Sequence, residues 1–200
     1  MKILEKILFF LGNNGQGGQA PYEAGHYGIA QLSTTTQATN TAAIGISRAG
    51  YTNQATIIHE TMIRIPTLSD GTNRFSVRSG FWNSIAGDGT IGIGIRYVDN
   101  VNSGKWVIVT RQSSIETVTN TNLTVSTSQW YKLRIEINSD ATEVKFYIND
   151  VLEATHTTNI PQNSEVNALA NIVKSSGTTA RTINIDYAYL HLNLNSARTF

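Results

Sequence analysis

The sequence predicts an all-β protein built as a two-sheet antiparallel sandwich. Apolar and polar residues alternate over residues 131–137 and again over residues 144–148, so each run has one dry face and one wet face. Asn138, Ser139 and Asp140 separate the two runs, and their short polar side chains favour a turn. Similar turn signals recur at short intervals along the chain, which is typical of a sandwich.

Strands are predicted along the chain from residue 22 onward, each bounded by Gly, Pro, Asn, Asp or Ser. Asn149 and Asp150 follow one of them and tolerate positive φ, so the chain is expected to reverse tightly there. The predicted strands are residues 27–33, 42–48, 55–65, 74–82, 90–98, 105–111, 114–119, 129–138, 142–149, 151–157, 167–174 and 181–194.

Residues 1–11 follow a helical rather than a strand period. A helix of about eleven residues is marginal alone in water, so its apolar stripe should rest on something. Docking on a partner or on symmetry copies is expected, while packing on its own domain and a targeting segment are the alternatives. The segment is too short to cross a bilayer, and no membrane partner is expected. The stripe that would form the anchor consists of Ile3, Leu4, Ile7, Leu8 and Leu11.

The next ten residues, rich in Gly, Asn and Gln, have the composition of a flexible linker. Residues 1–21 are therefore predicted to form an anchor helix and a Gly-rich tether. Residues 22–200 are predicted to form one β-sandwich domain, which is an ordinary size for that class.

The composition excludes several classes of function. The chain has no Cys, so disulfides and thiolate metal sites are excluded. Its 15 basic and 14 acidic residues give a net charge of +1, which offers no electrostatic reason to expect nucleic acid as a partner. Only 14% of residues are charged, and Thr, Ser, Asn and Gln supply the polar surface instead. Such faces suit a protein that packs beside copies of itself, and they are also common on solitary extracellular β domains.

The residue pattern of several predicted strands resembles that of the concanavalin A-like lectin/glucanase superfamily, the two-sheet jelly roll that includes laminin-G-like domains. Residues 130–133, 146–149 and 151–154 carry this resemblance, with Asp150 standing where Gly is usual. Three further pieces, at 26–33, 63–73 and 174–190, look like jelly-roll domains of phage virion structural proteins.

The resemblance implies a non-enzymatic phage virion structural protein: a capsid decoration protein, a head fibre or a tail-fibre head. Such a protein would be assembled in the host cytoplasm and work on the virion surface. It would form a homo-oligomer, most simply a trimer with a three-helix bundle at its axis. Residues 1–20 would contact other virion proteins, and the head could bind host polysaccharide. A free carbohydrate-binding module or a bacterial surface adhesin is the alternative, followed by a polysaccharide depolymerase.

No catalytic residues, cofactor or metal are predicted. Glycanase chemistry needs two carboxylates facing one bond, and glucanases of this superfamily carry them within a Glu-x-Asp-x-x-Glu run, which this sequence lacks. Asp88, Asp99 and Asn100 lie in predicted loops and are candidate ligand-binding residues. Calcium accepts such oxygens, but turn chemistry explains all three residues without it.

A binding site is expected on the loop side near residues 82–104. Trp82 precedes a polar, Gly-rich loop and is a candidate for a glycan or protein contact. Gly92 and Gly94 alternate with isoleucines in the strand that follows. Either a neighbouring element crosses close over these glycines, or they form the floor of a shallow groove.

Overall fold

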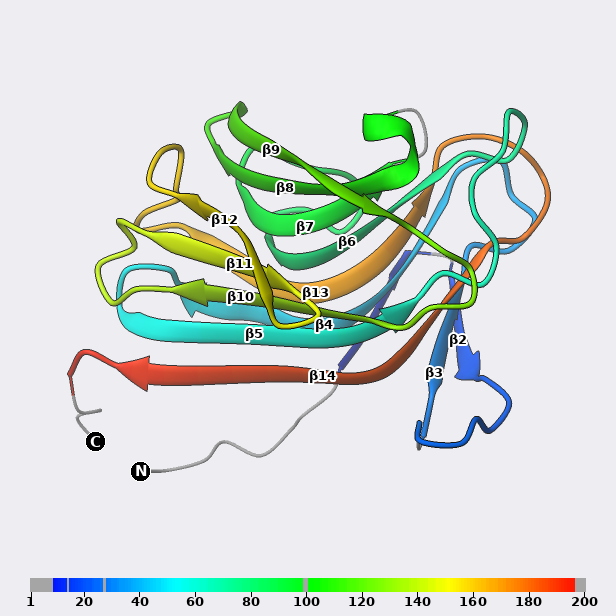
Figure 1. The fold of residues 1–200 in the computed structure, drawn as a ribbon, viewed down its shortest axis with the longest axis horizontal. Helices are drawn as coiled ribbons and strands as arrows, with labels where there is room; N and C mark the ends of the chain where they lie inside the picture. The colour runs from blue at the N-terminus through cyan, green and yellow to red at the C-terminus, as the bar shows by residue number, and fades with distance from the viewer. Residues whose placement is uncertain (1–8, 14, 27, 99–100, 197–200) are drawn as a thin grey trace.

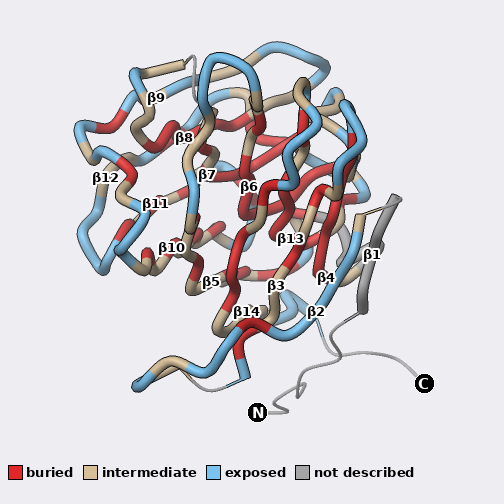
Figure 2. The backbone as a smooth tube through the Cα atoms, turned by 90° about the vertical axis from the view of Figure 1, so that its right-hand side faces the viewer, coloured by how far each residue is buried: buried red, intermediate tan, exposed pale blue. Residues whose placement is uncertain are grey.

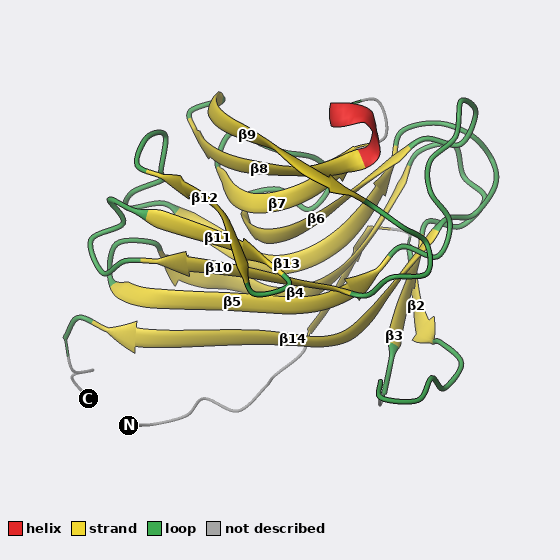
Figure 3. Ribbon diagram, in the orientation of Figure 1, coloured by secondary structure: helices red, strands yellow, loops and turns green. Residues whose placement is uncertain are grey.

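The structure, a computed structural model, describes residues 9–13, 15–26, 28–98 and 101–196 (Figure 1). Within these residues, fourteen strands form two antiparallel sheets of seven strands each, and the predicted two-sheet sandwich is confirmed. Each predicted strand has a counterpart in the sheets. Figure 3 shows a short 3-10 turn, η1 (Asn102–Gly104), in red between β7 and β8.

The two sheets, A and B, are each described in the spatial order of their strands. Sheet A consists of β1 (Phe9–Asn13), β4 (Asn40–Tyr51), β13 (Glu165–Lys174), β6 (Phe75–Trp82), β7 (Gly92–Val98), β8 (Lys105–Gln112) and β9 (Ile115–Thr124). Sheet B consists of β12 (Val151–His156), β11 (Val144–Ile148), β10 (Tyr131–Ile137), β5 (Ala55–Arg64), β14 (Thr182–Leu194), β3 (Ala30–Ser33) and β2 (Gln16–Gln19).

The core lies between the two sheets, where Figure 2 shows the buried residues. Burial alternates strictly along β10 and β11, as the sequence pattern predicted, and also along β5. Each fully buried aliphatic or aromatic side chain contributes about 1.5–3 kcal/mol relative to exposure. The core includes Ile57, Leu133, Ile135 and Phe146 from sheet B and Phe81, Ile95 and Ile108 from sheet A.

The turns form as their residue types predicted. Asn138 closes the turn before β11, because its side-chain oxygen accepts hydrogen bonds from the backbone amides of Thr142 and Glu143 at 2.9 Å each. Asn149 and Asp150 both have positive φ, 51° and 67°, in the tight reversal between β11 and β12. Asp150 therefore occupies a left-handed position where Gly is the more usual residue.

The predicted N-terminal helix is not seen. Residues 1–8, with Ile3, Leu4, Ile7 and Leu8, lie outside the described residues. Leu11 lies in strand β1, which pairs with β4. An isolated helix of this length is marginal, whereas the edge of a sheet offers a full row of backbone hydrogen-bonding partners.

Part of the predicted tether is likewise built into the sandwich. Strand β2 pairs with β3 in register from Gln16 to Gln19. Gly15 lies against β4 so closely that a Cβ there would be 2.3 Å from the carbonyl oxygen of Thr41. The glycine at this position therefore permits close packing of the backbone. No helix in the described part of the chain is long and apolar enough to span a membrane.

His59 is a titratable group at the centre of the core. It lies opposite Ile135 in the β5–β10 register, and its ring packs edge-on against Phe81 with centroids 5.3 Å apart. Burial lowers the pKa of His59 from 6.5 to about 4, so the folded protein holds the neutral ring. Burial also lowers the pKa of His156, which bridges Thr110 and Thr119 at the edge of the sandwich.

We expect the free energy of unfolding to fall as the pH is lowered from 6.5 towards 4, because unfolded His59 then takes up a proton that folded His59 excludes. The loss from this residue is on the order of 3 kcal/mol, and urea unfolding at a series of pH values measures it. His59→Gln should flatten the slope, leaving the part that belongs to His156 and, towards pH 4, to the carboxyls of Asp70 and Glu116, whose pKa values the fold lowers. Ile135→Ala should instead lower stability by about 2–5 kcal/mol at every pH. An unchanged slope in His59→Gln would contradict this assignment.

Candidate ligand-binding site on the outer face of sheet A

The outer face of sheet A, which is turned away from the core, carries an unusual row of large polar side chains. Arg78 on β6 lies opposite Asn171 on β13 and opposite Arg96 on β7. The strands alternate, so these residues point outward while Val77 and Ile95 point into the core. Register alone therefore brings two arginines and an asparagine from three strands together.

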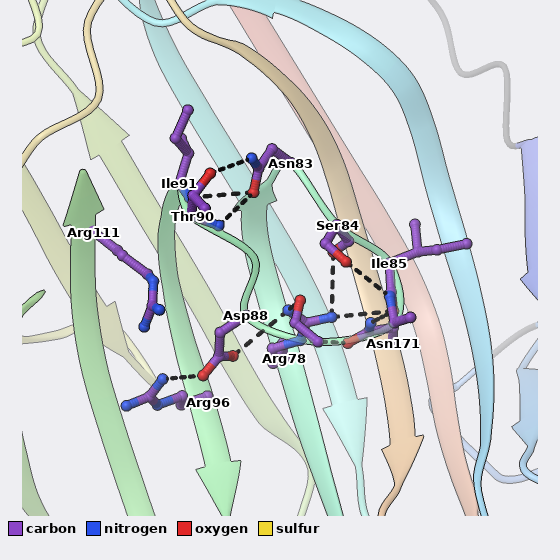
Figure 4. A network of polar contacts seen from close by, with 12 residues as sticks. Arg78, Asn83, Ser84, Ile85, Asp88, Thr90, Ile91, Arg96, Arg111 and Asn171 are labelled. Atoms are coloured by element: carbon purple, nitrogen blue, oxygen red, sulfur yellow. Dashed lines mark hydrogen bonds and ion pairs between the residues drawn. The ribbon is translucent and has the colours of Figure 1, made fainter. Parts of the chain in front are cut away.

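The loop of residues 83–91 between β6 and β7 lies back across this face, as Figure 4 shows. Arg78 holds it down: its guanidinium donates to the carbonyl oxygens of Ser84 (3.3 Å), Ile85 (3.1 Å) and Gly87. The Nε of Arg78 also donates to Oδ1 of Asn171 at 3.2 Å. The side-chain amide of Asn171 in turn donates to the Ile85 carbonyl at 2.7 Å.

An ion-pair network continues from the tip of this loop towards β9. Asp88 contacts Arg96 and lies 3.6 Å from Nη1 of Arg78 (Figure 4). Glu116 on β9 accepts two parallel hydrogen bonds from Arg96, 3.1 Å each, and one from Arg111 at 2.6 Å. Three arginines and two carboxylates are thus connected across β6, β7, β8 and β9.

The charges in this network are fixed at neutral pH. Burial lowers the pKa of Arg78 to about 10, although the charge of Asp88 opposes the shift, so the guanidinium stays ionised. Burial disfavours the ionised form of Glu116, but hydrogen bonds from Arg111 and Arg96 outweigh it and hold the pKa of that carboxyl below its usual value. Glu116 therefore remains a carboxylate.

Trp82 does not present a face to solvent. Its side chain is fully buried, in a small apolar cluster with Val107, Val109 and Leu169 that Ile85 of the loop covers. A Cβ at Gly92 or Gly94 would lie 2.3 Å or 2.6 Å from the Trp82 ring. The indole therefore lies directly on the two glycines, and the guanidinium of Arg78 lies 4.8 Å from its ring centroid. The close approach of the Trp82 ring therefore explains why glycines occupy positions 92 and 94. The structure does not support the alternative, in which they form the floor of a groove.

A hollow of about 470 Å³ opens beside the covering loop, at the end of the face where β6 begins and β13 ends. Its volume falls within the range of small-molecule sites. Polar groups and short apolar side chains line it together. The lining residues are Arg74, Phe75, Ser76, Gly87, Asp88, Val98, Val173, Ser175 and Ser176.

The sequence-predicted site residues separate in the structure. Asp88 lines the hollow, Trp82 is buried beneath the loop, and Asp99 and Asn100 lie outside the described residues. Within the described residues, no three acidic or histidine side chains gather as ligands for a metal ion.

The arginines are the functional residues that sequence reasoning missed. Arg78 and Arg96 occupy the polar parity of strands whose other parity is apolar, which ordinarily indicates a solvated face. The signal that could have identified them is two charges of the same sign on paired strands, here Arg78 opposite Arg96. That signal appears only when the β6–β7 register is known, and the sequence alone does not provide the register.

Comparison with known proteins places the chain in a family and a fold. A family model described as "SO2946-like, C-terminal domain" matches residues 25–186. No curated protein matches the sequence. Among solved structures, the SO2946 protein of unknown function from Shewanella oneidensis MR-1 is similar with a TM-score of 0.71 and 15% identity, covering 96% of this chain and 81% of that one.

Two glycan-related structures share the fold at lower similarity. The endo-β-1,4-glucuronan lyase from the fungus Trichoderma reesei has a TM-score of 0.62 and 11% identity, covering 91% of this chain and 89% of that one. The carbohydrate recognition domain of Emp47p has a TM-score of 0.56 and 11% identity, covering 91% and 90%. At these identities the likeness shows the shared fold alone.

Replacing Arg78 by Met should release the covering loop, because the carbonyls of Ser84, Ile85 and Gly87 lose their common donor. Hydrogen exchange measured by mass spectrometry should show residues 84–88 exchanging at least about tenfold faster, while β10 and β11 stay protected. Arg111→Met is the matched control, since it removes an arginine that touches no carbonyl of the loop. Equal protection of residues 84–88 in wild type and Arg78→Met would show that other contacts hold the loop.

Proposed function

This chain belongs to the family of SO2946-like C-terminal domains, and we propose that it binds carbohydrate on the outer face of sheet A without cleaving it. The observation that carries the proposal is the hollow beside the covering loop. It combines a carboxylate, a guanidinium and serine hydroxyls with two small apolar side chains. No other described feature of this face offers both room and directed hydrogen-bonding groups.

The chemistry of the hollow suits a sugar. The Asp88 carboxylate and the hydroxyls of Ser76, Ser175 and Ser176 are groups that hydrogen-bond to sugar hydroxyls. Val98 and Val173 supply an apolar surface for the C–H face of a pyranose ring. The proposal is further supported by the fold, because similar sandwiches include the Emp47p carbohydrate recognition domain and the Trichoderma reesei glucuronan lyase.

The same geometry supports binding rather than cleavage. Hydrolysis of a glycosidic bond requires a carboxylic acid that donates a proton, and Glu116 is held as a carboxylate by two arginines. Among the described residues on the outer faces of β6–β9 and β13, no His or Tyr is available as an alternative acid or base.

A place on a virion surface, a trimer and contacts of residues 1–20 with other virion proteins stay predictions that come from the sequence resemblance. The proposed glycan binding is compatible with a virion head and with a free binding module. It does not depend on which of the two is correct.

Ser175→Trp should abolish glycan binding, because an indole at this exposed position would fill the hollow. Affinity electrophoresis against a panel of soluble neutral and acidic polysaccharides identifies the ligand, and calorimetry then measures Kd. We expect Ser175→Trp to bind at least roughly tenfold more weakly than wild type. Ser128→Trp, in an exposed turn next to sheet B, is the matched control and should bind normally. Wild-type affinity in Ser175→Trp would place the binding site elsewhere.

Incubation of the protein with the polysaccharide that it binds should release no products. The test is an assay for new reducing ends, together with absorbance near 235 nm for the unsaturated sugars that a lyase would create. Both signals should stay at the level of a heat-denatured sample over many hours. A rise in either signal that Ser175→Trp abolishes would make the protein a polysaccharide-degrading enzyme.

A further inference from the structure

We propose that two copies of the chain pair through strand β14, so that sheet B continues across a two-fold axis into sheet B of the second copy. The interaction surface is the edge of β14 from Tyr187 to Leu194, which we call the free edge. This pairing is independent of glycan binding, because the free edge belongs to sheet B and the hollow lies on the outer face of sheet A.

The neighbouring strand covers only the beginning of β14. β3 pairs with residues 182–185, and no other described strand pairs with β14 on that side. On its opposite side, β14 stays in uninterrupted register with β5 from Tyr187 to Leu194. Figure 1 shows this part of β14 at the lower border of the sandwich. The free edge therefore presents a row of backbone N–H and C=O groups that a further strand could use.

The connection between β2 and β3 is fixed elsewhere and does not cover the free edge. It lies over the outer face of sheet B, where His26 hydrogen-bonds to Asp186 at 2.9 Å and stacks on Trp130 with ring centroids 4.3 Å apart. Glu23 of the same connection pairs with Arg64 at 2.7 Å and accepts a hydrogen bond from the Trp130 indole. These contacts leave the free edge, which begins directly after Asp186, without cover from this connection.

The free edge has none of the features that usually keep a sheet edge from pairing. Charged residues, Pro, bulges and short strand length are the common protections. From Tyr187 to Leu194 the chain contains no Lys, Arg, Asp, Glu or Pro. The other edge strands are different. β1 and β2 are short, β9 carries Glu116 and β12 carries Glu153, and the register of both β9 and β12 with their neighbours is interrupted.

Apolar side chains flank the free edge on both faces of the sheet. Leu190 and Leu192 pack against the core but stay only partly buried. Leu194 is 41% exposed, and Tyr189 on the outer face is 43% exposed. A strand beside β14 would remove part of this surface from water, and such burial drives association.

The free edge matches a copy of itself. In an antiparallel pair, directly opposite residues share a face, so a two-fold axis through Leu190 places Tyr189 opposite His191 of the second copy. These two rings already stack within one copy, with centroids 6.3 Å apart. The same axis places Leu192 opposite Ala188, so aliphatic side chains meet on the core side. A copy also brings its own charges to the same strand, and the free edge has no Asp, Glu, Lys or Arg to repel them.

The test is an exchange of charges on the free edge, with the molar mass measured by sedimentation over a series of protein concentrations. We expect the wild-type chain to form a dimer of twice 21.9 kDa. Tyr189→Lys with His191→Lys places like charges opposite each other, as does Tyr189→Glu with His191→Glu. Each double variant should dimerise at least about tenfold more weakly. An equimolar mixture of the two should form a dimer with one chain of each kind, because Lys then lies opposite Glu.

Val118→Lys with Asn120→Lys is the matched control, since it adds the same charges at exposed positions of another edge strand, β9, and should leave the dimer unchanged. A dimer restored in the mixture supports the proposal and shows that both variants fold. A monomeric wild-type chain overturns the proposal, as does an oligomer that neither double variant weakens, such as the trimer that the sequence resemblance implies. A mixture that stays monomeric overturns antiparallel pairing through β14, and a control that dissociates places the interface at β9 instead.

Discussion

The arrangement of the outer face of sheet A depends on the hydrogen bonds of one buried group, the guanidinium of Arg78. Removing such a charge from water costs several kcal/mol unless hydrogen bonds replace its hydration. Three loop carbonyls and Asn171 provide those bonds, and Trp82 covers its flat face. These bonds hold residues 84–87 against the sheet, and Asp88, which follows them, lies at the edge of the hollow.

The hollow is a consequence of this arrangement rather than a gap between strands. The loop covers the part of the face that is apolar, where Trp82 lies on Gly92 and Gly94, and leaves the polar end next to Ser175 and Ser176 uncovered. The loop that Arg78 holds thus covers one end of the face and leaves the other end open to a ligand.

The fold could be predicted from the sequence because its signals are local. Alternation along β5 and β10 has period two, and the turns at Asn138 and Asn149 depend on neighbouring residues. The helix predicted for the N-terminal segment was wrong for the same reason. A helical stripe that includes Leu11 is a local pattern, but pairing of β1 with β4 is decided by a distant sheet edge.

The site could be predicted only in part, because its geometry depends on register. Asp88 was predicted as a candidate binding residue because it is polar and lies in a predicted loop, and in the structure it lines the hollow. Trp82 looked like an exposed aromatic beside a loop, yet the loop folds over it and buries it. The placement of Arg78 opposite Arg96 appears only when β6 and β7 are aligned. Family membership and fold add no residue-level information, since the similar structures share 15% identity or less.

The most direct test of the central claim is to map the ligand on the protein by NMR. An isotope-labelled sample would be titrated with oligosaccharides of the polymer that it binds, and the backbone amide shifts followed. We expect the largest changes at residues 74–76, 87–88, 98 and 173–176, on one end of the outer face of sheet A. Changes centred instead on β5, β10 and β14 of sheet B would contradict the account.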